Sequence, residues 1–281
     1  MTKKIDILPI SKLYRIFNEK KWNGKEGHTT VFDNFCKLLL NLSETERNLI
    51  IELAERYTWI TYSEYSQHII NVLNKVEDAK LKSLRRIVLF PIMKPGDEGE
   101  TKSSHEVLYA VYSLRPLLER YKHISFKKIE TFKEITAQSF TIQGNEAIYL
   151  LDDYLGSGET IKATLTELFR NGNIKPYNLF IFSISAQKES LDYITDLGIP
   201  AYTEHLSRKG ISDYYEPPIR QEKINIMLEI EKLIPKNRFS LGYNKSEALI
   251  TLMRTPNNTF PIFWKEHKKC GENFAAPFSR F

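Results

Sequence analysis

Residues 148–160 read IYLLDDYLGSGET and join an apolar run, two adjacent aspartates and a loop in which two glycines flank a serine. The apolar run predicts a buried strand that ends at Asp152 and Asp153, and the residues from Gly156 to Thr160 predict a turn into a helix. Backbone N–H groups and the helix dipole at such a turn favour an anion, most naturally a phosphate. Two carboxylates beside a phosphate suit the hydroxyls of a sugar, with a divalent cation nearby to reduce the repulsion. The stretch therefore predicts a site for a phosphorylated ribose.

Three other glycine-containing loop motifs do not match this spacing. A nucleotide P-loop needs a lysine after its second glycine, where Glu159 stands. A dinucleotide fingerprint needs glycine where Ile161 stands, and a nucleophile elbow needs glycine where Leu155 stands. The remaining alternative is a tight strand-to-helix turn with an ordinary acidic cluster and no ligand.

Strands and helices alternate with short connections on both sides of this stretch. The predicted strands are residues 85–93, 125–132, 147–153, 178–185 and 199–206, and the predicted helices between and after them are residues 105–121, 158–172 and 187–198. This alternation predicts the fold class α/β, with a mostly parallel sheet flanked by helices. Right-handed crossovers then gather the loops that follow the strands at one edge of the sheet, where such sheets bind ligands.

The motif resembles the binding motif for 5-phosphoribosyl-1-pyrophosphate in type I phosphoribosyltransferases. The resemblance implies that Asp152 and Asp153 hold the ribose hydroxyls and contact Mg²⁺ only indirectly, through the substrate. It also implies a loop that wraps the 5-phosphate, made of Leu155, Gly156, Ser157, Gly158, Glu159 and Thr160. Members that act on 6-oxopurines often carry an aspartate where Gly156 stands, so this chain departs from that subclass.

In that family a loop after the first strand of the sheet holds the pyrophosphate. The corresponding residues 90–105 read FPIMKPGDEGETKSSH, and their candidate ligands for a diphosphate are Lys94, Lys102, Ser103 and Ser104. The segment is long and acidic for such a loop, so a surface loop without a role in binding is an equal alternative. Arg208 follows another strand end and is either an anion ligand or part of a solvated basic turn.

The whole chain resembles the phosphoribosyltransferase-like proteins of bacterial conflict systems, which include effectors encoded with retrons. The similarity lies in LIIELAERYTWITYSEY (residues 49–65), in the glycine motif, and in the tail LGYNKSEALITLMRTPNNTFPIFW (residues 241–264). It implies a role in anti-phage defence or a toxin-like effector of nucleotide metabolism. A partner consistent with this is a reverse transcriptase with its RNA or DNA.

Three domains are expected from these patterns. Residues 1–84 form a helical module in which Ser43 and Glu46 make a capping box, residues 85–236 form the phosphoribosyltransferase-like core, and residues 237–281 complete the core or its hood. In the last segment, residues 246–255 predict a strand. The aromatic residues of PNNTFPIFW (residues 256–264) either line a pocket for a base or pack against the helical module.

Composition limits the partners and the compartment only broadly. Forty basic and 35 acidic residues give a net charge of +5, which is compatible with anionic ligands but specific for none. Seven basic residues near the start leave nucleic-acid contact open: Lys3, Lys4, Lys12, Arg15, Lys20, Lys21 and Lys25. The widely separated Cys36 and Cys270, and the lack of an apolar leader or membrane-length run, predict a cytoplasmic protein.

The sequence thus favours a Mg²⁺-dependent phosphoribosyltransferase, a glycosyltransferase-class enzyme that makes or breaks a bond at ribose C1. Its ligand would be 5-phosphoribosyl-1-pyrophosphate or a ribonucleotide. The alternative is a catalytically inactive module with the same fold that senses nucleotides or docks a partner.

Overall fold

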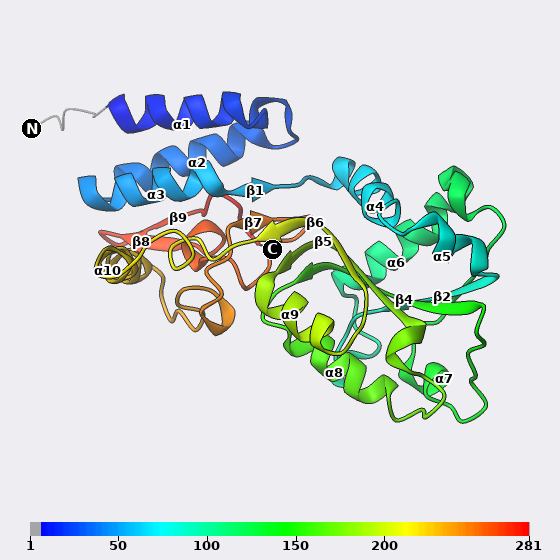
Figure 1. The fold of residues 1–281 in the computed structure, drawn as a ribbon. Coiled ribbons are helices and arrows are strands. Elements are labelled where there is room, and N and C mark those ends of the chain that lie inside the picture. Colours follow the sequence, from blue (N-terminus) through cyan, green and yellow to red (C-terminus); the bar gives the residue numbers. More distant parts are fainter. Residues whose placement is uncertain (1–6, 281) are drawn as a thin grey trace, which may run out of the picture. The chain divides into compact units, whose positions relative to one another are not determined.

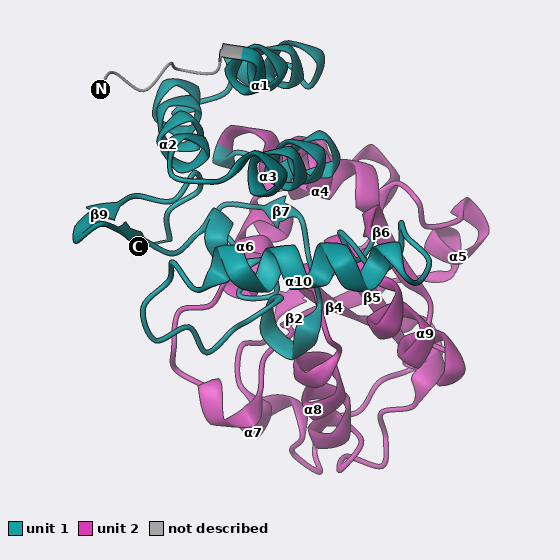
Figure 2. Ribbon diagram, turned by 90° about the vertical axis from the view of Figure 1, so that its left-hand side faces the viewer, with its two compact units in different colours: residues 1–62, 208–281 teal, residues 63–207 magenta. Residues whose placement is uncertain are grey.

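The structure is a computed structural model that describes residues 7–280 (Figure 1). Lys3 and Lys4, part of the basic cluster expected near the start, lie outside the described residues. The chain divides into two compact units, which we call the sheet unit (residues 63–207) and the discontinuous unit (residues 1–62 and 208–281) (Figure 2). No helix among the described residues is long and apolar enough to cross a membrane.

A five-stranded sheet forms the centre of the sheet unit, and all its strand pairs are parallel. Its strand order is β3-β2-β4-β5-β6. The strands are β2 (Arg86–Pro91), β3 (Ser125–Lys128), β4 (Glu146–Leu155), β5 (Leu179–Gln187) and β6 (Ala201–Ser207). The mixed α/β class with a parallel sheet, predicted from the sequence, is therefore confirmed.

Helices cover both faces of this sheet (Figure 1). One face carries α4 (Tyr65–Leu73) and α6 (Ser103–Leu114), and the other carries α7 (Phe132–Ile135), α8 (Glu159–Leu168) and α9 (Lys188–Asp196). A further short helix, α5 (Asp78–Ser83), belongs to the same unit. On the α8 side, completely buried side chains such as Ile148 and Leu150 of β4 pack against Leu165 of the helix. This apolar layer fixes where α8 begins relative to the end of β4.

The strand order reverses between β2 and β4, which are neighbours in the sheet. From β2 the chain crosses outward to β3, and from β4 it continues in the opposite direction to β5 and β6. In open parallel sheets the crevice beyond the carboxyl ends of such a strand pair is the usual place for a ligand. Both predicted binding loops leave the sheet here, after β2 and after β4.

The discontinuous unit combines helices from both ends of the chain. Its helices are α1 (Ile7–Glu19), α2 (His28–Leu40), α3 (Glu44–Arg56) and α10 (Ile219–Glu231), and its strands pair as β1 (Thr58–Trp59) with β7 (Ile250–Thr251) and as β8 (His267–Lys269) with β9 (Glu272–Phe274). The predicted capping box of Ser43 and Glu46 starts α3. Phe260 and Phe263 are completely buried in one core with residues of α1, α2 and α3. This confirms that the aromatic tail packs against the helical module.

Several predicted boundaries differ from the structure for local reasons. The helix predicted to reach residue 121 ends at Leu114, because Pro116 lacks the N–H that an α-helix interior requires and a 3₁₀ turn follows. The strand predicted at residues 246–255 contains only Ile250 and Thr251, since Glu247 has a left-handed backbone with φ of 49°. Strand β4 extends to Leu155, beyond the predicted end at the aspartates, because its pairing with β5 continues that far.

The two units also divide the chain differently from the three expected domains. Helices α4 and α5, expected in the helical module, belong to the sheet unit. Helix α10, expected in the core, belongs to the discontinuous unit together with the C-terminal segment. A helical pattern in the sequence carries no information on which sheet or helix its apolar face will meet.

Candidate functional site

The carboxyl end of β4 carries the two predicted aspartates in a buried position. Asp152 is 9% exposed and Asp153 is 4% exposed, although both lie at the edge of the sheet where the loops gather. Burial of a carboxylate is costly unless partners stabilise it. The partners of these two groups therefore determine what the site can do.

Asp153 accepts hydrogen bonds from two side-chain hydroxyls on separate helices. Ser103 donates to Oδ1 at 2.7 Å, and Tyr65 donates to Oδ2 at 3.1 Å. Ser103 is the first residue of α6, which follows the β2 loop, and Tyr65 is the first residue of α4. The structure thus brings the predicted Ser103 to the aspartates, and it adds Tyr65, a residue of the expected helical module for which the sequence predicts no role in binding.

Asp152 has fewer protein partners than its neighbour. Its Oδ1 accepts the backbone N–H of Asp153 at 2.9 Å. Burial and then the nearby charge of Asp153 raise the pKa of Asp152 well above its ordinary value. Burial also raises the pKa of Asp153, against the opposing effect of the Ser103 and Tyr65 hydroxyls. Both shifts oppose the presence of two negative charges on the pair, and an approaching cation or hydroxyl donor would reduce that penalty.

A buried hydroxyl lies next to Asp152 in the sheet. Ser183 of β5 is the register partner of Asp152 and is 2% exposed. Its Oγ has no hydrogen-bond partner among the residues that the structure describes. An unpaired polar group beside a buried carboxylate marks a place where polar ligand atoms would be stabilised. Serine within an apolar strand gave no signal for this in the sequence.

The glycine loop turns directly from β4 into α8. Gly158 precedes the first helical residue and has φ of 83°, a left-handed conformation that favours glycine. Ser190 donates a hydrogen bond to the carbonyl of Gly156, so the loop is held from α9 as well. Thr164 of α8 donates to the carbonyl of Met93 at 2.8 Å, which joins the helix to the loop after β2. The N-terminal N–H groups of α8 thus occupy a fixed position at the switch point.

The predicted ligands in the loop after β2 differ in whether they reach the glycine loop. Lys94 Nζ lies 3.4 Å from Glu159 Oε2 at the start of α8, which places this lysine beside the glycine loop. Lys102 instead pairs with acids of its own loop, at 2.6 Å from Glu100 and 3.6 Å from Asp97. Ser104 is 1% exposed, and its Oγ has no hydrogen-bond partner within residues 7–280.

The remaining loop residues keep the exposure expected of a binding loop. Gly156, Ser157, Glu159 and Thr160 are half-buried, whereas Leu155 packs into the core on the α8 side. The Glu159 side chain is 41% exposed and extends toward Lys94. This carboxylate therefore competes with any anion for the same ammonium group.

Basic residues outside the sheet unit have partners of their own. Arg208 donates to the carbonyl of Asp213 and lies 4.5 Å from the ring centroid of Tyr214. Lys20 donates to the carbonyl of Tyr57, and Lys25 donates to that of Trp59. All these contacts lie within the discontinuous unit, and the solvated-turn interpretation of Arg208 fits them.

The match to a family model agrees with the fold. The family model PRTase-CE, which describes phosphoribosyltransferase-like proteins, matches residues 38–280. No curated protein matches the chain. Among solved structures, that of the AQ2163 protein from Aquifex aeolicus is 11% identical and has a TM-score of 0.29, with 65% of this chain and 86% of that chain covered.

Proposed function

The chain belongs to the phosphoribosyltransferase-like family PRTase-CE, and from this premise we propose that it binds 5-phosphoribosyl-1-pyrophosphate or a ribonucleotide and makes or breaks a bond at ribose C1. The observation that carries the proposal is the position of Asp152 and Asp153. They lie at the carboxyl end of β4, beside the glycine turn and at the reversal of strand order. A ribose phosphate supplies hydroxyl donors for the acids and an anion for the turn.

Each group would act on a different part of the ligand. Asp152 accepts the backbone N–H of Asp153, and it would also accept a ribose hydroxyl. The hydroxyls of Ser103 and Tyr65 position Asp153 and would hold it as an acceptor for the second ribose hydroxyl. The N–H groups from Gly156 to Thr160 would bind the 5-phosphate.

Lys94 would bind the diphosphate after its ammonium leaves Glu159. In the forward direction the C1–O bond breaks and its electron pair leaves with pyrophosphate. A nitrogen of the acceptor then forms the new C1–N bond and loses its proton to solvent or a base. The protein contributes mainly by positioning these groups and by stabilising charge.

Magnesium fits this site only through the substrate. The carboxylate oxygens of Asp153 already accept hydroxyls from Ser103 and Tyr65, and Asp152 is 9% exposed, so the pair is not an open cage of oxygen ligands. Mg²⁺ would arrive on the diphosphate and neutralise part of its charge as the bond to C1 breaks. The acids would contact it indirectly, through the ribose hydroxyls.

The loop after β2 favours a second candidate, a module that senses nucleotides without turning them over. Lys102 is held by Glu100 and Asp97, and Lys94 is shared with Glu159. This loop therefore offers less positive charge to a diphosphate than its lysines suggest. Binding of a ribonucleotide without any product would identify this case.

The proposal is tested by calorimetric titration of 5-phosphoribosyl-1-pyrophosphate with Mg²⁺ into the wild-type chain and the Asp152→Asn variant. We expect binding to the wild type and an affinity at least about 100-fold lower for the variant, since a charge-assisted acceptor is replaced by a neutral amide. Asp192→Asn is the matched control, because Asp192 lies on α9 of the same unit and is exposed. Equal binding to wild type and Asp152→Asn would overturn the assignment of the acids.

The biological setting that we propose is that of an effector in the cytoplasm of a bacterium with an anti-phage system of the retron type. It rests on the resemblance of residues 49–65 and 241–264 to proteins of conflict systems. The partner would be a reverse transcriptase with its RNA or DNA. Co-purification of the tagged chain with such a complex, and its loss at high salt, would support contact with nucleic acid.

A further inference from the structure

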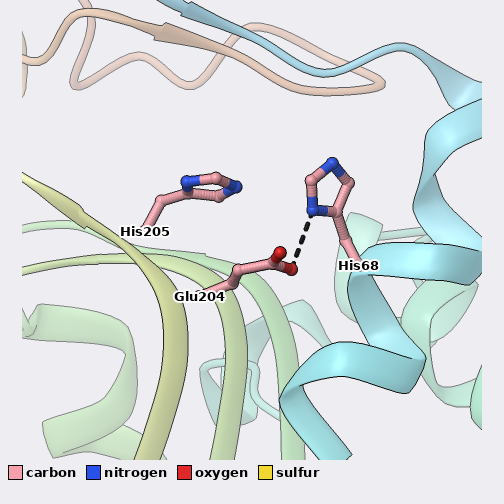
Figure 3. A group of neighbouring side chains, drawn as sticks. All are labelled: His68, Glu204 and His205. Atoms are coloured by element: carbon pink, nitrogen blue, oxygen red, sulfur yellow. Dashed lines mark hydrogen bonds and ion pairs between the residues drawn. The ribbon is translucent and has the colours of Figure 1, made fainter.

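A second group of polar side chains lies at the β6 edge of the five-stranded sheet, whose other edge strand is β3. His68 comes from α4, and Glu204 and His205 are consecutive residues of β6, the last strand (Figure 3). One ligand atom from each of the three residues lies within 4.8 Å of the other two. His68 Nδ1 and Glu204 Oε2 are 2.8 Å apart, and the two imidazole centroids are 5.2 Å apart. All three side chains are half-buried.

The hydrogen bonds within the cluster do not involve all of its potential metal-ligand atoms. His205 Nε2 is buried and has no hydrogen-bond partner among the described residues. Such a nitrogen is costly to bury without a partner. A cation that accepts imidazole ligands would satisfy it.

The carboxylate is also oriented from outside the cluster. Asn71 lies one helical turn after His68 and donates its Nδ2–H to Glu204 Oε1 at 3.0 Å. The other oxygen, Oε2, faces His68. Outer hydrogen bonds of this kind fix a ligating carboxylate and are common around protein-bound metals.

From this geometry we propose that His68, Glu204 and His205 bind one divalent transition-metal ion of the zinc class. Two imidazoles and one carboxylate form a known donor set for zinc, with bonds of about 2.0–2.2 Å and a fourth position for water. The ligand atoms need to move apart only slightly at the His68–Glu204 contact to admit the ion. Hard cations such as Mg²⁺ prefer all-oxygen ligands and would not compete well here.

The site would fasten α4 to the edge strand of the sheet. Helix α4 also begins with Tyr65, which is one turn before His68 and donates to Asp153. Metal binding would therefore stabilise the helix that positions this hydroxyl. Since the site uses none of Asp152, Asp153 or the glycine loop, its test is independent of the proposed ribose-phosphate function.

The test is calorimetric titration of zinc into the full chain after removal of metal with a chelator. We expect one tight site per chain in the wild type and an affinity at least about 100-fold lower in His68→Gln and in His205→Gln, since each loses a ligand. Asn71→Ala should weaken zinc about 10-fold, as loss of an outer hydrogen bond does. His123→Gln is the matched control, because His123 is in the same unit and contacts the carbonyl of Leu81 instead.

Two further measurements distinguish the loss of a metal ligand from the loss of folding. Circular dichroism and thermal unfolding of each metal-free variant show whether it folds. Zinc should raise the melting temperature most in the wild type and His123→Gln, less in Asn71→Ala, and least in His68→Gln and His205→Gln. Cobalt replaces zinc and gives visible absorption bands that report nitrogen ligands in the wild type even if a variant fails to fold. Absence of a tight zinc site in the wild type, or full zinc affinity in folded His205→Gln, would overturn the proposal.

Discussion

Buried carboxylates occur in both units, and their partners differ in kind. In the discontinuous unit, Glu247 is 3% exposed and accepts two backbone N–H groups, of Ile211 at 3.0 Å and of Ser212 at 2.8 Å, in addition to the Ser212 hydroxyl at 2.5 Å. In the sheet unit, Asp153 is 4% exposed and accepts the hydroxyls of Ser103 and Tyr65. Backbone groups are fixed by the chain, whereas hydroxyls rotate and can exchange partners.

This difference separates a carboxylate that supports the fold from one that is ready for a ligand. The N–H groups held by Glu247 would be orphaned without it, because Ile211 is completely buried. Asp152, by contrast, lies beside a second acid and beside the Ser183 hydroxyl, which has no hydrogen-bond partner in the described part of the chain. The first arrangement minimises the free energy of the unbound chain, and the second leaves favourable contacts for a bound molecule to make.

The largest expected effect tests the structural carboxylate. Glu247→Ala should lower the free energy of unfolding of the discontinuous unit by about 4 kcal/mol, since two N–H groups lose their acceptor at about 1–3 kcal/mol each. Trp22, Trp59 and Trp264 all lie in this unit, so tryptophan fluorescence in urea reports its unfolding. The exposed Glu266→Ala is the control. A loss below about 1 kcal/mol would contradict the assigned role.

A second prediction concerns the pH dependence of the same unit. Burial raises the pKa of Glu231 to about 7 from an ordinary value of 4.5. The folded state then binds the proton more tightly than the unfolded state, so stability falls as pH rises from about 4.5 to about 7, by about 3 kcal/mol at most. Glu231→Gln should remove this fall, and the exposed Glu229→Gln should not. Urea unfolding followed by tryptophan fluorescence across this pH range measures it.

The third prediction sharpens the contrast in the sheet unit. Asp152→Asn should leave the stability of the sheet unit at neutral pH unchanged or higher by about 1 kcal/mol, because a neutral amide avoids the cost of a buried charge. The raised pKa of Asp152 has the same sign as that of Glu231, so the gain should shrink as pH falls and the wild-type carboxyl is protonated. Urea unfolding followed by far-UV circular dichroism at several pH values measures the change in stability and its pH dependence. A marked loss of stability would make Asp152 a structural residue like Glu247.

The smallest expected effect tests the competition for Lys94. Glu159→Gln should tighten binding of 5-phosphoribosyl-1-pyrophosphate about fivefold, since the pair is solvent-exposed and opposite charges about 4 Å apart in water contribute about 1 kcal/mol. Glu167→Gln, near the other end of α8, is the control. Weaker binding in Glu159→Gln would mean that this carboxylate helps to hold the ligand or its metal.

The sequence predicted the strands, the glycine turn and the acids because each depends on near neighbours in the chain. An apolar run before Asp152 is enough to indicate a buried strand, and the residues from Gly156 to Thr160 are enough to indicate a turn into a helix. Lys94 and Ser103 were proposed through the resemblance to a family in which the loop after the first strand binds pyrophosphate. Tyr65 and Ser183 were not found, because a tyrosine on a helix and a serine in a strand are common and their partners lie far away in sequence.

The sequence by itself determined the fold class and the position of the candidate site along the chain, since hydrophobic periodicity and turn chemistry are local properties of the chain. Tertiary structure alone decided which polar groups meet. It joined Tyr65 to Asp153 across 88 positions and His68 to Glu204 across 136. It also assigned α4 to the sheet unit and α10 to the other. The physical reason is that packing selects partners by shape and burial over the whole unit, and no local pattern encodes that choice.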